Sequence, residues 1–412
     1  MTMKNSTSTG NPVGKTALVC GGGGITGGVF EVGALRALDR CLGGGVVNSL
    51  DCYAGASAGS LVATLLASGL TPEDMDDVLV RGARNRKRLP PLKRTSIYGL
   101  DLGMWAASAG KLPWRMGKGF ALSLLPGDSS RPTDALFEAL GGMPSGLFTN
   151  EPLAKYVSEI LEKLGLGQDF ENFPRELLIT AVNVDTGHRV VFGQQGLREI
   201  PISRAIQASA ALPLLFKPVR LAGQDFVDGG IERNLPVDVA VQNGASLIIA
   251  VNPMVPVVND PRGGDSMMSG HRYLSDRGLP AVLDQVLRML VRSQVVYGLR
   301  AMRDQFPEVD IVLLEPEAHD WRMFSYHPMR YSVRQQLAQH AYDMTAERLL
   351  RESDSLTHIF ERHGLDFQAQ RLGFGKKRRA GVNAAKRVFH GLGKLPVLRK
   401  MAASDDEPDP FW

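Results

Sequence analysis

Residues 16–70 alternate short apolar runs, glycine-rich turns and segments with helical spacing. The run TALVC (16–20) predicts a buried strand, and the glycine-rich segment after it leads into the helical pattern FEVGALRALDRCL. The run LDCYA (50–54) predicts a second strand, which passes through GASAG into the apolar helical segment SLVATLLASGL. Two successive units of strand, turn and helix are typical of a parallel α/β sheet.

Strand-like runs return later in the chain and support the same fold class. They are LLITAVN (177–183), RVVF (189–192), DFVD (225–228), LIIAVN (247–252) and DIVLL (310–314). Residues 281–299 instead repeat apolar residues at helical intervals. The sequence therefore predicts an α/β fold around a central, mostly parallel sheet.

The other segments suggest how the chain is divided. We expect a flexible N-terminus at 1–15, one large domain at 16–315 with its core motifs in 16–255, a helical extension at 316–375 and a basic amphipathic tail at 376–412. Within the large domain, residues 73–150 read as an irregular insert with basic and apolar stretches.

The cysteines and the hydropathy of the chain indicate where in the cell the protein is expected. Cys20, Cys41 and Cys52 are an odd, sparse set without the spacing of a disulfide framework or a metal site. The first 15 residues do not resemble a signal peptide, and no uncharged apolar run approaches the roughly 18 residues of a membrane span. We therefore expect a cytoplasmic protein with no metal site, whose membrane contact is at most peripheral.

The segment GASAG places Ser57 between a predicted strand and a predicted helix. Small residues on both sides, including Gly55 and Gly59, permit the sharp turn that exposes a nucleophilic serine next to a helix N-terminus. The same five residues would also suit a plain turn that starts a helix. The strand–turn–helix context favours Ser57 as a nucleophile.

The glycine-rich segment at 21–28 has three interpretations. Gly22, Gly24 and Gly27 match the G-x-G-x-x-G dinucleotide fingerprint, with Asp51 near the place of a ribose-binding acid. The free amides of such a loop also suit an oxyanion hole, and the segment would equally serve as a tight strand-to-helix connection. The GASAG turn on the adjacent predicted strand favours the oxyanion hole.

Asp228 ends the strand-like run DFVD and is followed by Gly229 and Gly230. Two glycines allow another side chain to approach closely, so Asp228 could accept the Ser57 proton directly. The alternative is an ordinary Asp–Gly turn.

A Ser–His–Asp triad is the competing arrangement, because G-x-S-x-G also marks α/β-hydrolases. The histidines after Asp228 are His271, His319, His327, His340, His358 and His363. Several lie in polar or helical stretches typical of solvated positions, so the triad ranks second.

These motifs, in this order and spacing, resemble the patatin-like phospholipases. The resemblance rests on GGGGITG, GASAG and VDGG, with support from ASAALPLLFKP (208–218) and VDGGIERNLPVD (227–238), and it covers roughly residues 15–255. It implies a three-layer α/β/α sandwich and hydrolysis of phospholipids or other acyl glycerides without a cofactor.

Residue by residue, the resemblance implies a Ser–Asp dyad without histidine. Ser57 would be the nucleophile and Asp228 the general base, and the oxyanion hole would be formed by Gly22, Gly23, Gly24 and Gly27. Thr26 stands where the family usually has Lys or Arg. A same-fold esterase acting on a thioester, sterol ester or storage polyester, and a weakly catalytic lipid-binding scaffold, stay open as alternatives.

Two basic stretches suggest contact with an anionic membrane. Residues 81–94 hold seven Lys or Arg and no acid, and Tyr98, Trp105, Trp114 and Phe120 follow. Residues 376–412 hold nine Lys or Arg, and apolar residues recur there at helical intervals. Either stretch could instead be a solvated face. We expect no nucleic-acid partner, because no recognised binding module accompanies the charge.

Overall fold

The computed structural model describes residues 14–83, 87–110, 114, 117, 141–194, 196–259, 273–317, 320–324 and 326–373. The predicted tail at 376–412 and most of the N-terminus at 1–15 lie outside these residues. Within them, no helix is both long and apolar enough to span a bilayer.

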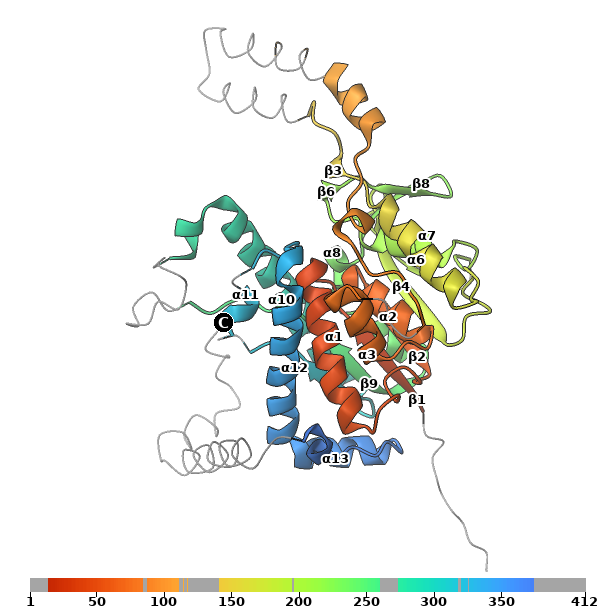
Figure 1. Ribbon diagram of the computed structural model, residues 1–412, viewed down its shortest axis with the longest axis vertical. Coiled ribbons are helices and arrows are strands. Elements are labelled where there is room, and N and C mark those ends of the chain that lie inside the picture. Colours follow the sequence, from red (N-terminus) through yellow and green to blue (C-terminus); the bar gives the residue numbers. More distant parts are fainter. Residues whose placement is uncertain are drawn as a thin grey trace, which may run out of the picture.

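An eight-stranded sheet forms the centre of the molecule (Figure 1). Its strands are β1 (Lys15–Cys20), β2 (Cys52–Ala56), β4 (Glu176–Asn183), β5 (Arg189–Phe192), β7 (Val219–Leu221), β8 (Gln224–Asp228), β9 (Ala245–Val251) and β10 (Asp310–Leu314). The order is β10-β9-β1-β2-β4-β8-β7, and β5 also pairs with β4. The first five strands in this order are parallel, while β5, β7 and β8 pair antiparallel. The predicted α/β fold with a mostly parallel sheet is confirmed.

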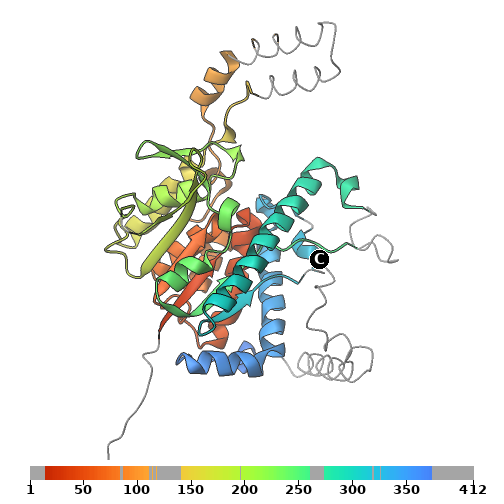
Figure 2. The ribbon, with the colours of Figure 1, turned by 180° about the vertical axis from the view of Figure 1, so that it is seen from behind.

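Helices cover both faces of this sheet, as Figures 1 and 2 show. They are α1 (Gly24–Cys41), α2 (Ala58–Ala67), α3 (Pro72–Met75), α6 (Glu151–Lys163), α7 (Ile202–Ser209), α8 (Gly230–Arg233), α9 (Val237–Gln242), α10 (Leu279–Gln305), α11 (Trp321–Phe324), α12 (Arg334–Arg351) and α13 (Ser353–Arg362).

Alternate residues of β1 belong to two separate hydrophobic cores. Leu18 and Cys20 pack with α1, α2 and α12, whereas Ala17 and Val19 pack with α9 and α10. Since both faces of the strand are buried, its sequence is continuously apolar rather than alternating. The arrangement is the three-layer α/β/α sandwich that was predicted.

Three short strands, β3, β6 and β7, escaped the sequence analysis. β3 (Gly146–Phe148) and β6 (Leu214–Phe216) pair with each other in a small separate sheet. Three residues are too few to show the two-residue alternation by which a strand is recognised. The residues between α3 and β3 also include a helical stretch at 102–110.

α12 and the residues that follow α13 pack against the first helix of the sandwich. α12 crosses α1 so closely that a Cβ atom on Gly33 would lie 2.4 Å from the carbonyl oxygen of Ala338. Further on, the Gln368 amide donates to the carbonyl of Cys41, the last residue of α1. The chain beyond β10 thus covers the outer side of α1 along its length.

Candidate active site

Ser57 lies in the turn between β2 and α2 with φ 52° and ψ −126°, a conformation that non-glycine residues rarely adopt. Its amide donates to Ser209 Oγ at 2.8 Å. The flanking glycines are required by close approach: a Cβ on Gly55 would lie 2.5 Å from the Gly59 carbonyl oxygen, and one on Gly59 would lie 2.4 Å from that of Cys20. The structure thus builds the sharp turn that GASAG predicted.

The Ser57 hydroxyl donates to Asp228 Oδ2 at 2.6 Å. The two residues are 171 positions apart, and the sheet register brings them together. β4 runs between β2 and β8, pairing Thr180 with Ala56 on one side and Ala181 with Asp228 on the other. Both side chains are nearly buried, with Ser57 9% and Asp228 3% exposed.

The other oxygen of Asp228 accepts from the backbone. The Gly230 amide donates to Asp228 Oδ1 at 2.8 Å, and the Gly229 amide donates to the Ser209 carbonyl. Burial raises the pKa of Asp228 to about 6, although the bonds from Ser57 and Gly230 oppose that shift. A carboxyl group with this pKa is poised to exchange a proton near neutral pH.

The glycine-rich loop lies directly against the nucleophile. A Cβ on Gly22 would lie 2.8 Å from Ser57 Cβ. Gly22 is fixed from both sides by one side chain, since its amide donates to Asn234 Oδ1 at 2.9 Å and its carbonyl accepts from Asn234 Nδ2 at 3.3 Å. The Gly27 amide donates to the Gly23 carbonyl.

Two of the four glycines assigned to the oxyanion hole therefore already use their amides. Gly23 caps α1 and Gly24 begins it, and their amides have no acceptor among the described residues. The first amides of a helix have no intrahelical partner, and they lie at its positive end. Within this loop, Gly23 and Gly24 offer the donors that an anion could use.

A distant segment also holds the start of α1. We call residues 327–329 the strap. The carbonyl of Pro328 accepts from the amide of buried Thr26 at 2.9 Å, and a Cβ on Gly24 would lie 2.9 Å from Met329 Sδ. The Tyr98 hydroxyl donates to the Met329 carbonyl at 3.5 Å. The strap belongs to the chain beyond β10, so two far-separated segments meet at this loop.

The described histidines do not form a triad with Ser57. His340 bonds Asp320 at 2.7 Å, and His363 bonds Asp310 at 2.8 Å, both away from the dyad. None of the described histidines shares a hydrogen bond with Ser57 or Asp228, while His271 and His319 lie outside the described residues. The hydrogen bond between Ser57 and Asp228 thus involves none of the described histidines.

The acid that the dinucleotide fingerprint would need makes a hydrogen bond within the sheet. Asp51 accepts a hydrogen bond from the Thr16 amide at 2.8 Å and so joins the starts of β1 and β2. The described ranges contain no group of three His, Cys, Asp or Glu side chains placed to hold a metal ion.

Part of the basic stretch at 81–94 is engaged within the molecule. Arg81 pairs with Asp76 at 2.6 Å, Lys87 lies 3.7 Å from Asp74, and the Arg94 guanidinium lies over the Tyr98 ring. Arg84 and Arg86 lie outside the described residues. At least three of the seven charges thus have a structural partner.

Sequence reasoning missed three contributors to this site. Asn234 and Ser209 lie inside the segments VDGGIERNLPVD and ASAALPLLFKP, whose likeness to the family was the only signal available. Nothing in the sequence of the strap indicates its contact with Thr26.

Comparison with known proteins gives a consistent result. The family model described as patatin-like phospholipase matches residues 18–241. A probable lipid hydrolase, 463L of Invertebrate iridescent virus 6, is 23% identical over 226 residues, which are 53% of this chain and 61% of that protein. YqhO of Bacillus subtilis, an uncharacterized protein, is 23% identical over 194 residues, 45% of this chain and 54% of its own. The chain thus spans between half and two thirds of these relatives.

Two solved structures resemble the fold at low identity. VipD from Legionella pneumophila has a TM-score of 0.35 at 16% identity, covering 82% of this chain and 67% of its own. The type III effector ExoU has a TM-score of 0.34 at 19% identity, covering 82% of this chain and 53% of its own.

Proposed function

We propose, since the chain belongs to the patatin-like phospholipase family, that it hydrolyses acyl esters of lipids through a Ser57–Asp228 dyad. The observation that carries the proposal is the 2.6 Å hydrogen bond from Ser57 Oγ to the buried Asp228 carboxylate. A serine in a sharp strand-to-helix turn, bonded to its own base, has the two groups that acyl transfer requires.

In the first half of the reaction, Ser57 Oγ attacks the ester carbonyl carbon while its proton passes to Asp228 Oδ2. The carbonyl oxygen becomes an oxyanion, which the amides of Gly23 and Gly24 stabilise. The intermediate then collapses, the C–O bond to the alcohol breaks, and the leaving alcohol takes the proton from Asp228. The product is an acyl group esterified to Ser57.

In the second half, a water molecule gives a proton to Asp228 and attacks the acyl carbon. The new oxyanion occupies the same hole, and its collapse releases the fatty acid as the proton returns to Ser57 Oγ. One carboxylate with a pKa of about 6 serves both halves, because it is largely ionised at neutral pH yet basic enough to accept a proton.

The missing Lys or Arg at position 26 leaves the loop without a side-chain cation. Thr26 is 3% exposed, and its amide is bonded to the strap. The positive end of the 18-residue helix α1 is then the main positive potential facing the oxyanion from this loop.

The experiment is hydrolysis of a soluble short-chain ester by the full chain. We expect turnover by the wild type, loss of it in Ser57→Ala, and retention in Ser49→Ala, which removes an exposed hydroxyl bonded only to a local carbonyl. Full activity of Ser57→Ala would reject the nucleophile, and an inactive wild type would support the weakly catalytic scaffold.

A substrate panel then separates the lipid classes. We propose that phospholipids or other acyl glycerides are cleaved faster than thioesters, sterol esters or storage polyesters, as the family and the relative named a lipid hydrolase suggest. We also propose that the protein acts in the cytoplasm, which agrees with three buried cysteines that are all free thiols.

A further inference from the structure

The first half of α10 is oriented with its polar side toward the protein. Arg288 is 3% exposed and pairs with Asp284 at 2.9 Å. Gln285 exchanges two hydrogen bonds with the backbone of Val257, and Arg292 pairs with Glu315 at 2.6 Å. Val257 and Glu315 follow the carboxyl ends of β9 and β10, so this half of α10 lies at the same end of the sheet as Ser57.

The opposite side of the same half is apolar and faces solvent. Leu279, Leu283, Val286 and Leu290 recur at intervals of four, three and four residues and so share one stripe. Their exposed fractions are 70%, 53%, 40% and 59%. This polarity is the reverse of that of an ordinary surface helix, which buries its apolar stripe.

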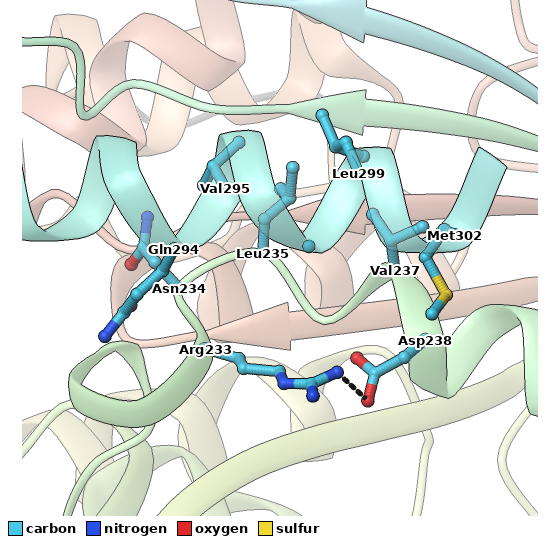
Figure 3. Close-up of a pocket in the computed structure, with 10 residues that line it drawn as sticks. Arg233, Asn234, Leu235, Val237, Asp238, Gln294, Val295, Leu299 and Met302 are labelled. Atoms are coloured by element: carbon cyan, nitrogen blue, oxygen red, sulfur yellow. Dashed lines mark ion pairs between the residues drawn. The ribbon is translucent and has the colours of Figure 1, made fainter. Parts of the chain in front are cut away.

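The second half of α10 shows the normal polarity. Val291 and Val295 are 4% exposed, and Leu299 and Met302 pack near Leu235. Figure 3 shows this half lying over residues 233–238, with a shallow pocket between them. One continuous helix therefore turns its apolar side inward at one end and outward at the other.

A second apolar element projects from another part of the molecule. Leu102 is 76% exposed and Trp105 is 39% exposed, on the helical stretch at 102–110. Trp105 Nε1 donates to the Leu147 carbonyl at 3.2 Å, and Asp101 pairs with Lys217, so the stretch is anchored to β3 and β6. In Figures 1 and 2 it and the first half of α10 both extend beyond the carboxyl ends of the parallel strands.

We propose that these two elements form one docking face that rests on the surface of a lipid bilayer. The docking face is defined by Leu279, Leu283, Val286, Leu290, Leu102 and Trp105. The inference rests on the proposed function, because it places the end of the sheet that carries Ser57 against the bilayer, which would contain a lipid substrate.

The chemistry of the docking face fits lipid better than a second protein surface. Leucines would enter the headgroup–acyl boundary, and a tryptophan at the edge is the residue that this boundary favours. Lys93, which precedes the helical stretch in the chain, is exposed, and its charge complements anionic headgroups. A fluid leaflet also accepts two separate projections at once, whereas a protein partner would have to match both in shape.

The test uses the double variant Leu283→Asp/Leu290→Asp of the full chain. Its control is Ser355→Asp/His358→Asp, which adds the same charges to exposed positions of α13, at the opposite end of the molecule (Figure 1). Sedimentation with vesicles of phosphatidylcholine and phosphatidylglycerol is run at high salt, where exposed cations contribute little.

We expect the first variant to bind vesicles at least about tenfold more weakly, because each substitution places a charge where the bilayer boundary is apolar. The control should bind as the wild type does. Both should hydrolyse a soluble short-chain ester normally, which separates a failed docking face from a failed dyad. Trp105→Ala should weaken vesicle binding on its own.

Two results would overturn the proposal. One is unchanged vesicle binding by Leu283→Asp/Leu290→Asp. The other is a wild-type dimer in light scattering that this variant converts to a monomer, which would make the docking face an interface between two copies of the chain.

Discussion

The two glycine-containing turns of the site are built in different ways. The turn at Ser57 is closed by its own residues and by the adjacent strand, since Gly55 contacts Gly59 and Gly59 contacts Cys20. The loop at Gly22–Gly27 is instead held by Asn234 and by the strap, which are more than 200 residues away. The turn at Ser57 is therefore closed by local contacts and by one distant hydrogen bond, from the Ser57 amide to Ser209 Oγ, whereas the loop that carries the proposed oxyanion donors depends on long-range contacts throughout.

The largest loss of activity should come from replacing Asp228, which accepts the hydrogen bond from Ser57. Asp228→Asn removes the base, and general-base catalysis contributes about 100- to 10,000-fold, so kcat/KM on a soluble ester should fall by that range. Asp225→Asn is the control, because Asp225 lies on the same strand and its side chain pairs with exposed Arg220. A His→Ala variant that matched the loss, with Asp228→Asn mild, would restore the triad.

Replacing Asn234 tests whether the glycine-rich loop depends on a distant side chain. Asn234→Ala frees both backbone groups of Gly22 and lets the loop drift, so we expect kcat to fall by about tenfold to 100-fold, below the cost of losing an oxyanion donor outright. Asn243→Ala, which removes a bond to the Val239 carbonyl at the end of α9, should leave kcat unchanged. Equal effects of the two variants would mean that the loop needs no such anchor.

The dependence of kcat/KM on pH reports the ionisation of Asp228 and is independent of the contacts that position the glycine-rich loop. Ionised Asp228 is the active form, so kcat/KM should be half-maximal near pH 6, level off well above it and fall about tenfold per pH unit well below it. The folded-state pKa exceeds the ordinary value of 3.8, so the folded protein binds this proton more tightly than the unfolded chain does. Its contribution to stability is therefore present at low pH and is lost as pH rises from about 4 to 6. Asn234→Ala should lower the rate without moving the inflection.

Replacing a side chain of the strap should have the smallest effect on kcat. Met329→Ala removes the side chain that packs on Gly24 but leaves the Pro328 carbonyl, so we expect a loss in kcat of a few fold, about 1 kcal/mol in barrier height. Met344→Ala removes the same atoms from α12, where the side chain lies beside Leu314 and Thr345, and serves as the control. If both variants lost only stability, measured by thermal unfolding, the strap would have no role in positioning.

The difference between local and long-range contacts explains which parts of the site the sequence could predict. Apolar runs identified β4, β5 and β8, and the glycine patterns placed Ser57 and Asp228 on elements that the register brings together. The contacts of Asn234 and Pro328 could not be predicted, because they join segments that share no local pattern. The outward polarity of α10 was also hidden, since helical periodicity shows that one side is apolar but not which way it faces.

The most direct measurement of the dyad is the site of covalent labelling by a fluorophosphonate, which phosphonylates an activated serine. We expect a single adduct, mapped by peptide mass spectrometry to Ser57, whose rate of formation falls sharply in Asp228→Asn. An adduct on another serine, or labelling of Ser57 at the same rate in Asp228→Asn, would contradict the Ser57–Asp228 account.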